Sequence, residues 1–163
     1  MSSNQKVVVI GLGNILMEDE GIGVHVANHL EEKYHFSPEI EIVDGGTSGL
    51  DLLPFFDQEN SVLIIDAVNF HMAPGTIGVL KDDDILNQLD PKISLHHLGL
   101  SDLISVSDLL DKKPHRMTLL GIQPESMDNL DLEMTATIKG VFDKIVHNAL
   151  DLLKEWGVES SKR

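Results

Sequence analysis

Acidic and histidine side chains occur where apolar runs are expected to end or helices to begin. Asp66 directly follows the run SVLII, Glu20 closes the segment GLGNILMEDE, and His96 and His97 stand just ahead of an amphipathic segment. Two carboxylates and one imidazole form a donor set that suits Ni, Zn, Fe or Mn and leaves positions open for water or a substrate group. These residues are therefore candidate metal ligands, although their spacing alone does not bring them together.

The segment VVVIGLGNILMEDEGIGVHVA has the strand, glycine turn and helix pattern of a dinucleotide-binding loop. Leu16 stands where that motif has its third glycine or other small residue, and leucine is too bulky for the close packing of strand and helix that the motif requires. Glu18, Asp19 and Glu20 would repel a phosphate, and the first two are expected at a helix N-terminus. Asp44 stands where a ribose-binding acid would follow the second strand, so a nucleotide site stays open as a minor alternative.

His25 and His29 form a competing metal pair, four residues apart on the expected first helix. The run HVANH lacks the glutamate of a HExxH zinc protease, and both histidines flank an apolar stripe, so a helix flank is the preferred interpretation. The chain has no cysteine and no GxSxG elbow. Thiolate zinc sites, disulfides and the usual nucleophiles of covalent acyl chemistry are therefore excluded.

The composition points to one acidic globular domain. The chain has 163 residues, 27 acidic against 12 basic, and a net charge of −15. No Lys/Arg cluster offsets this charge, which excludes nucleic acid as a partner. No apolar run has the ~18–20 residues that a membrane span needs, and the polar start MSSNQK is unlike a signal peptide. We therefore expect a cytoplasmic protein that does not bind membranes.

Alternating strand and helix patterns predict an α/β fold: a single three-layer αβα domain around a mostly parallel, twisted, five-stranded sheet. The domain is expected over residues 1–163, with a core of about 7–156 and a short polar tail. Only ten residues separate Ile65 from Thr76, too few for a crossover helix, so the fourth strand is expected to be antiparallel to its chain neighbour. The expected strands are 7–10, 39–43, 62–65, 76–80 and 117–122, and the expected helices are 20–34, 49–57, 83–90, 99–111 and 134–156.

Six segments, in this order, resemble the successive motifs of the NiFe-hydrogenase maturation endopeptidases. The resemblance runs from about Val7 to Trp156, and six ordered motifs are far more specific than a lone glycine loop. The segments are GLGNILMEDEGIGV, VDGGTSGLDLL, LIIDAV, APGTIGVL, ISLHHLGLSDLI and LLGIQPES.

The resemblance implies a function and a set of site residues. Members of the family remove a short C-terminal extension from the hydrogenase large-subunit precursor after nickel has been inserted. Their metal contacts correspond to Glu20, Asp66 and His96, and Asp44 in the DGG motif matches a further recurrent acid. This chain has two consecutive histidines where relatives commonly have one, so His97 could substitute for His96 or assist it.

The resemblance further implies peptide hydrolysis with nickel as the recognition element, delivered bound to the precursor. Asp44 or Asp66 is the candidate general base, and the family has been grouped with aspartic peptidases. The expected partner is the large-subunit precursor, and the protein is expected to be a monomer. The alternative from another functional class is a non-catalytic nickel-binding checkpoint or chaperone for the large subunit. Only catalytic turnover separates the two.

Overall fold

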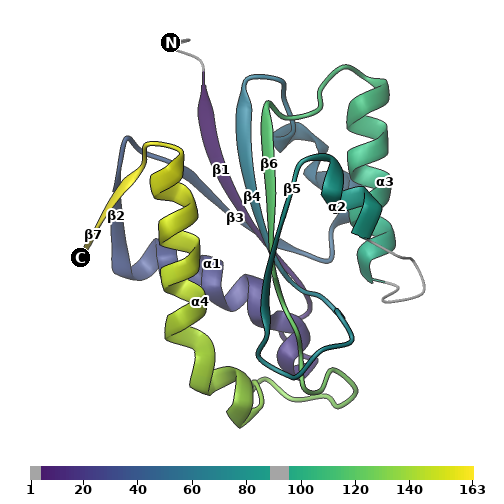
Figure 1. The fold of residues 1–163 in the computed structure, drawn as a ribbon, viewed down its shortest axis with the longest axis vertical. Helices are drawn as coiled ribbons and strands as arrows, with labels where there is room; N and C mark the ends of the chain where they lie inside the picture. Colours follow the sequence, from purple (N-terminus) through teal and green to yellow (C-terminus); the bar gives the residue numbers. More distant parts are fainter. Residues whose placement is uncertain (1–4, 89–95) are drawn as a thin grey trace.

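A computed structural model describes residues 5–88 and 96–163 of the chain. Within these residues one sheet has five strands in the order β3-β1-β4-β6-β5, with a separate two-stranded sheet of β2 and β7 (Figure 1). No helix in the described residues is both long and apolar enough to cross a membrane. The strands are β1 (Lys6–Leu12), β2 (Tyr34–Ser37), β3 (Glu41–Gly46), β4 (Asn60–Ala67), β5 (Ile77–Lys81), β6 (Arg116–Ile122) and β7 (Glu159–Lys162). The helices are η1 (Glu18–Gly21), α1 (Ile22–Lys33), η2 (Gly49–Phe55), α2 (Asp83–Gln88), α3 (His96–Leu109) and α4 (Ala136–Glu155).

The predicted three-layer α/β fold is confirmed. Strands β3, β1, β4 and β6 are parallel, and β5 pairs antiparallel with β6. The short connection after β4 therefore returns the chain in the opposite direction, as expected, but β5 pairs with the strand that follows it in the chain. One hydrophobic core joins the sheet to α1 and α4, and a second joins it to η2, α2 and α3.

Several local predictions differ from the structure. The helix expected over 99–111 begins at His96 and so includes both histidines, and Tyr34–Ser37 forms the strand β2, which was not predicted. The helical pattern at 49–57 forms the 3₁₀ helix η2, which contains Pro54. The polar tail pairs as β7 with β2, in the register Tyr34 to Lys162, and Arg163 N donates to the Lys33 carbonyl at 2.9 Å. All four residues of β7 are exposed, so this strand has no buried face and leaves no hydrophobic alternation in the sequence.

The start of α1 lies directly on the carboxyl ends of β1 and β4. A Cβ at Gly23 would stand 2.0 Å from the Ile65 carbonyl oxygen and 2.5 Å from that of Leu12. A Cβ at Gly11 would in turn stand 2.3 Å from the Gly23 carbonyl oxygen. Only glycine permits this approach of helix to sheet. The contact places η1, which immediately precedes α1, at the edge of the sheet where β1 and β4 end.

We expect Gly23→Ala to push α1 off the strand ends, because its Cβ would meet rigid backbone atoms. Gly140→Ala is the matched control: it also adds one methyl group to a helix, but nothing lies within 4 Å of its Cβ. Gly23→Ala should lower the free energy of unfolding in urea by more than about 2 kcal/mol. Gly140→Ala should leave it unchanged or raise it by up to about 1 kcal/mol. Equal stabilities for the two variants would contradict this account.

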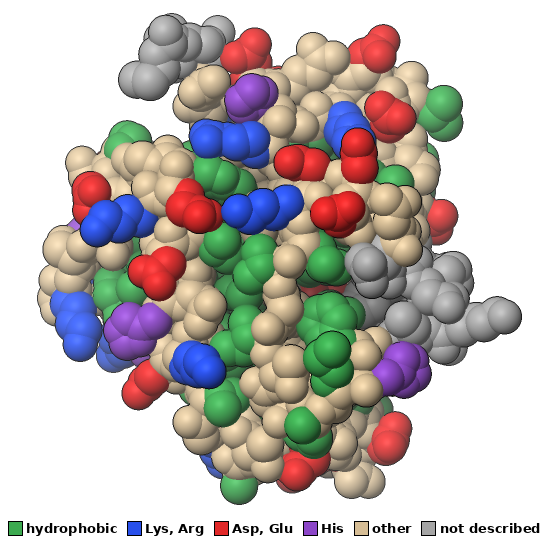
Figure 2. Space-filling view, viewed as in Figure 1, with side chains coloured by type: hydrophobic (Ala, Val, Ile, Leu, Met, Phe, Trp, Pro, Cys, Tyr) green, Lys and Arg blue, Asp and Glu red, His purple; other side chains and the backbone are tan. Residues whose placement is uncertain are grey.

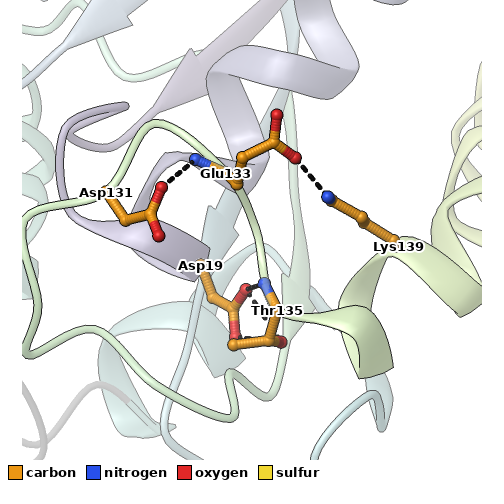
Figure 3. A network of polar contacts seen from close by, with 5 residues as sticks. All are labelled: Asp19, Asp131, Glu133, Thr135 and Lys139. Atoms are coloured by element: carbon orange, nitrogen blue, oxygen red, sulfur yellow. Dashed lines mark hydrogen bonds and ion pairs between the residues drawn. The ribbon is translucent and has the colours of Figure 1, made fainter.

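Asp19, in η1, is fully buried and ties three parts of the chain together. Its Oδ2 accepts hydrogen bonds from the backbone N–H groups of Glu125 and Ser126 at 2.9 and 3.1 Å. Its Oδ1 accepts from Thr135 N at 2.8 Å, and the Thr135 hydroxyl donates to Oδ2 at 2.8 Å (Figure 3). Glu18 completes the connection, since its Oε1 accepts from the Ser126 hydroxyl at 2.9 Å. The loop between β6 and α4 is thereby fixed to η1.

Both acids lie in the first turn of a helix, as expected, but neither caps it. The N-terminus of η1 has no side-chain cap hydrogen bond, and both carboxylates instead bind the loop between β6 and α4. Glu18 has a φ of +51°, a left-handed backbone conformation that costs energy for a residue other than glycine. The bonds to the loop offset this cost.

Asp19→Asn should lower the free energy of unfolding by about 1–3 kcal/mol, because an amide NH₂ would then face backbone N–H donors. Hydrogen exchange at 125–135 should become faster. Asp131→Asn is the matched control, because it removes the same charge from an exposed side chain of the same loop, one that accepts a hydrogen bond from Glu133 N. Stability and exchange in Asp131→Asn should stay near those of the wild type. If Asp19→Asn behaved like this control, the loop would not depend on the Asp19 carboxylate.

Candidate active site

Asp66 lies at the carboxyl end of the central strand β4 and is fully buried. Its Oδ1 accepts a hydrogen bond from Ala67 N at 2.8 Å. Alternate residues of β4 face opposite layers, with Leu63 and Ile65 in the core formed with α1 and α4. Ile64 belongs to the core formed with η2 and α3. By this alternation Asp66 faces the layer that contains α3.

Glu20 lies in η1, which contacts the end of β4. The side chain is half-buried. Its backbone is held by the glycine turn after β1: a Cβ at Gly13, where φ is +129°, would stand 1.8 Å from the Glu20 carbonyl oxygen. The glycine loop therefore seats an acidic helix beside the strand end, at the position that a phosphate would occupy in a dinucleotide-binding domain.

His96 is the first residue of α3, and its side chain and that of His97 lie outside the described part of the structure. The backbone nevertheless shows where the first turn of α3 lies relative to the sheet. Leu109 ends α3 and β6 begins at Arg116, so α3 runs back from the carboxyl edge of the sheet towards its amino edge. The first turn of α3 therefore lies on the side where β1 and β4 end (Figure 1). Its histidines share that edge of the sheet with Asp66 and Glu20.

Among the side chains that the structure describes, no three of His, Asp and Glu gather closely enough to hold a metal ion. A metal site that used Asp66 and Glu20 would need a further ligand from beyond this part of the chain, and the predicted one is His96 or His97. The donor chemistry fits nickel only incompletely, because carboxylates and an imidazole lack the soft thiolates that complete many nickel and zinc sites. The assignment of Glu20, Asp66 and His96 as metal contacts stays a prediction.

Asp44 lies at the carboxyl end of β3, is exposed, and accepts a hydrogen bond from Gly46 N at 3.1 Å. In the sheet register Gly11 pairs with Asp44 on one side and with Ile65 on the other. Asp44 is thus two strand spacings, roughly 10 Å, from the end of β4. It also follows the alternation of Ile42, which packs against the core on the α1 side. Asp44 and Asp66 consequently occupy opposite faces of the sheet and do not form a close pair of aspartates.

The two histidines of α1 are part of the packing of that helix, as the sequence favoured. His29 packs edge-on against Phe142 of α4, with ring centroids 5.3 Å apart. The pKa of His25 is lowered because burial disfavours the charged ring, and Glu133 and Asp44 partly oppose this shift. His29 therefore packs on the flank of the helix, and the Nε2 atom of His25 is buried with no hydrogen-bond partner among the residues that the structure describes.

Gln123, which the sequence analysis did not single out, fixes the loop that follows Asp66. Its Oε1 accepts from Phe70 N at 2.6 Å and from Met72 N at 3.4 Å. Its Nε2 donates to the Asn69 side chain at 3.2 Å. The available signal was a polar residue immediately after the buried run of β6, a position where a side chain must find partners at the sheet edge.

A hollow of about 360 Å³ opens on the glycine turn after β1 and the end of β3. Asp44 lines it, together with residues of the loop before η1. The lining residues are Gly13, Asn14, Ile15, Leu16, Val24, Asp44, Gly46 and Thr47.

The family model and the similar proteins of known name all indicate one family. The family described as hydrogenase maturation protease matches residues 24–152. The hydrogenase 2 maturation protease of Escherichia coli strain K12 is 36% identical over 159 residues, which cover 97% of this chain and 96% of that protein. The hydrogenase expression/formation protein HupD of Rhodobacter capsulatus is 35% identical over 159 residues, or 97% of this chain and 76% of that protein.

The fold agrees with this family as well. The solved structure of the hydrogenase maturating endopeptidase HybD from E. coli superposes with a TM-score of 0.91 at 36% identity and covers 98% of both chains. The HybD maturation protease of Thermococcus kodakarensis, at 23% identity and a TM-score of 0.70, shares the fold. The chain therefore belongs to the hydrogenase maturation protease family and is an endopeptidase of hydrogenase maturation.

Proposed function

We propose that this protein removes the C-terminal extension of a NiFe-hydrogenase large-subunit precursor after nickel insertion. Nickel enters the reaction as part of the precursor, bound by its thiolates, and serves as the element that the protease recognises. The reaction takes place in the cytoplasm, and the protease acts as a monomer.

The observation that carries the proposal is the position of Asp66 at the carboxyl end of the central strand β4, which η1, the helix that bears Glu20, contacts. Ligands of open α/β sheets bind outside the carboxyl ends of the strands, so both carboxylates lie at the edge where a substrate is expected. Together with His96 they offer oxygen and nitrogen donors to an ion that already has soft sulfur ligands on the precursor. Neither protein alone then supplies a complete coordination shell, which makes nickel loading the signal for cleavage.

The protein's residues would act mainly by positioning. Glu20, Asp66 and His96 would hold the loaded precursor so that the peptide bond to be cut lies beside a water molecule. Asp44 and Asp66 are the candidate general bases for that water. Because they lie on opposite faces of the sheet, they would act separately, unlike two aspartates that share a proton.

Mass spectrometry of the nickel-loaded precursor, before and after incubation with this protein, tests the function directly. We expect loss of the C-terminal fragment with multiple turnovers. Stable binding of the precursor without release of any fragment would contradict the proposal and would favour the non-catalytic checkpoint.

We expect Glu20→Gln, Asp66→Asn and His96→Ala each to lower the processing rate by more than about 100-fold, which exceeds the loss of roughly 10- to 100-fold typical of groups that only orient metal ligands. Glu32→Gln is the matched control, because it makes the same change at an exposed position of α1. His97→Ala should have a milder effect. Full processing by all three variants would contradict the assignment, and an inactive His97→Ala with an active His96→Ala would move the ligand by one residue.

Processing should require nickel already bound to the precursor. Incubation of the protein with nickel-free and nickel-loaded precursor, followed by quantification of the released fragment, should show release from the loaded form alone. Free peptides that span the cut should resist cleavage, because they lack the metal-loaded fold. Equal cleavage of the two precursor forms would show that nickel does not license the reaction, and the catalytic groups would then be sought among Asp44 and Asp66.

A further inference from the structure

Three leucines at the carboxyl edge of the sheet are exposed although their backbone is ordered. Leu16, Leu130 and Leu132 have exposed fractions of 47%, 81% and 63%. We call these three residues the leucine ledge. Large apolar side chains that gather at one exposed place mark interaction surfaces in soluble proteins. Figure 2 shows that exposed hydrophobic side chains are scattered over the face that it draws, among acidic, basic and polar ones.

The ledge is held together by backbone bonds between its two loops. Met17 and Asp131 form a parallel bridge. Asp131 N donates to the Leu16 carbonyl at 2.8 Å, and Glu18 N donates to the Asp131 carbonyl at 3.0 Å. Asn129 N donates to the Glu18 carboxylate at 3.1 Å. The leucines therefore stand on a fixed support, and a partner that covers them need not order the loops first.

The surroundings of the ledge are acidic. The segment PESMDNLDLEMT has four exposed carboxylates and no Lys or Arg, and one of the four, Glu133, pairs with Lys139 of α4. Glu18 and Asp19, which lie nearby, are buried and are not part of this surface. Asp128 is exposed next to the ledge. A surface of exposed leucines among carboxylates is complementary to a segment of apolar side chains flanked by Lys or Arg.

We propose that the leucine ledge is the docking surface for the large-subunit precursor, which contacts it through an apolar segment flanked by basic residues. This inference rests on the proposed function. Leu16 is four residues before Glu20, and the loop between them leads directly into η1. A precursor segment on the ledge is therefore held beside the candidate metal contacts and orients the bond to be cut.

The test compares two double variants of exposed leucines in processing of nickel-loaded precursor. Leu130→Ser with Leu132→Ser should raise KM by about tenfold or more, with kcat within about twofold of the wild type, because the ledge would contribute binding and not chemistry. Leu109→Ser with Leu110→Ser is the matched control, since these residues are 83% and 53% exposed at the end of α3, on the opposite edge of the sheet. It should leave both constants unchanged.

A charge reversal tests the basic character of the partner. Asp128→Lys should raise KM, whereas Asp151→Lys, which makes the same change at an exposed position on α4, should not. Melting temperatures of all variants should match that of the wild type, because every altered side chain is exposed.

Three results would overturn the proposal. The first is a KM for the ledge variant equal to that of the wild type, and the second is an equal rise in KM for the control at the end of α3. The third is a wild-type dimer in sedimentation that the ledge substitutions dissociate, which would assign the surface to a second copy of this chain. If the wild type releases no fragment, the proposed function fails separately. The ledge is then judged by the Kd of the loaded precursor for the same variants, with the same tenfold criterion.

Discussion

The buried carboxylate of Asp19 is the interaction on which this edge of the molecule depends. It accepts hydrogen bonds from both ends of the loop that joins β6 to α4, at Glu125 and Ser126 and again at Thr135. The neighbouring Glu20 and the residues before α4 are therefore fixed with respect to each other. Such a charge is tolerated in the interior because its acceptor positions are filled by protein donors. The candidate site and the loop beside it consequently form one rigid unit.

The fold was largely predictable because its main elements carry strong hydrophobic patterns. The buried runs of β1, β4 and β6 are apolar on both faces, as expected for central strands covered by helices on two sides. Strand β7 was not predictable, since its stability comes from backbone pairing with β2 and not from burial. The direction of β5 followed from loop length alone, but its neighbour in the sheet depends on tertiary packing that no local pattern encodes.

The candidate site was predictable in its residue types but only partly in its arrangement. The position of Asp66 at a strand end follows from the apolar run before it. The roles of Glu18 and Asp19 depend on partners more than 100 positions later in the sequence, which spacing within the acidic triplet cannot reveal. The separation of Asp44 from Asp66 likewise depends on strand order and pleat. Local sequence thus indicated which groups could act, and the register of the sheet decides which of them can act together.

Because Asp44 and Asp66 lie on opposite faces of the sheet, the end of strand β1 stands between them. A peptide that touches both aspartates has to cross the edge of the sheet at Gly11 and Leu12, where α1 already lies close to the backbone. At about 3.3 Å per residue, a crossing of roughly 10 Å takes at least three residues of extended chain. Three residues is therefore the shortest extended segment that could reach both carboxylates, and a substrate that engaged only one of them would need no such length.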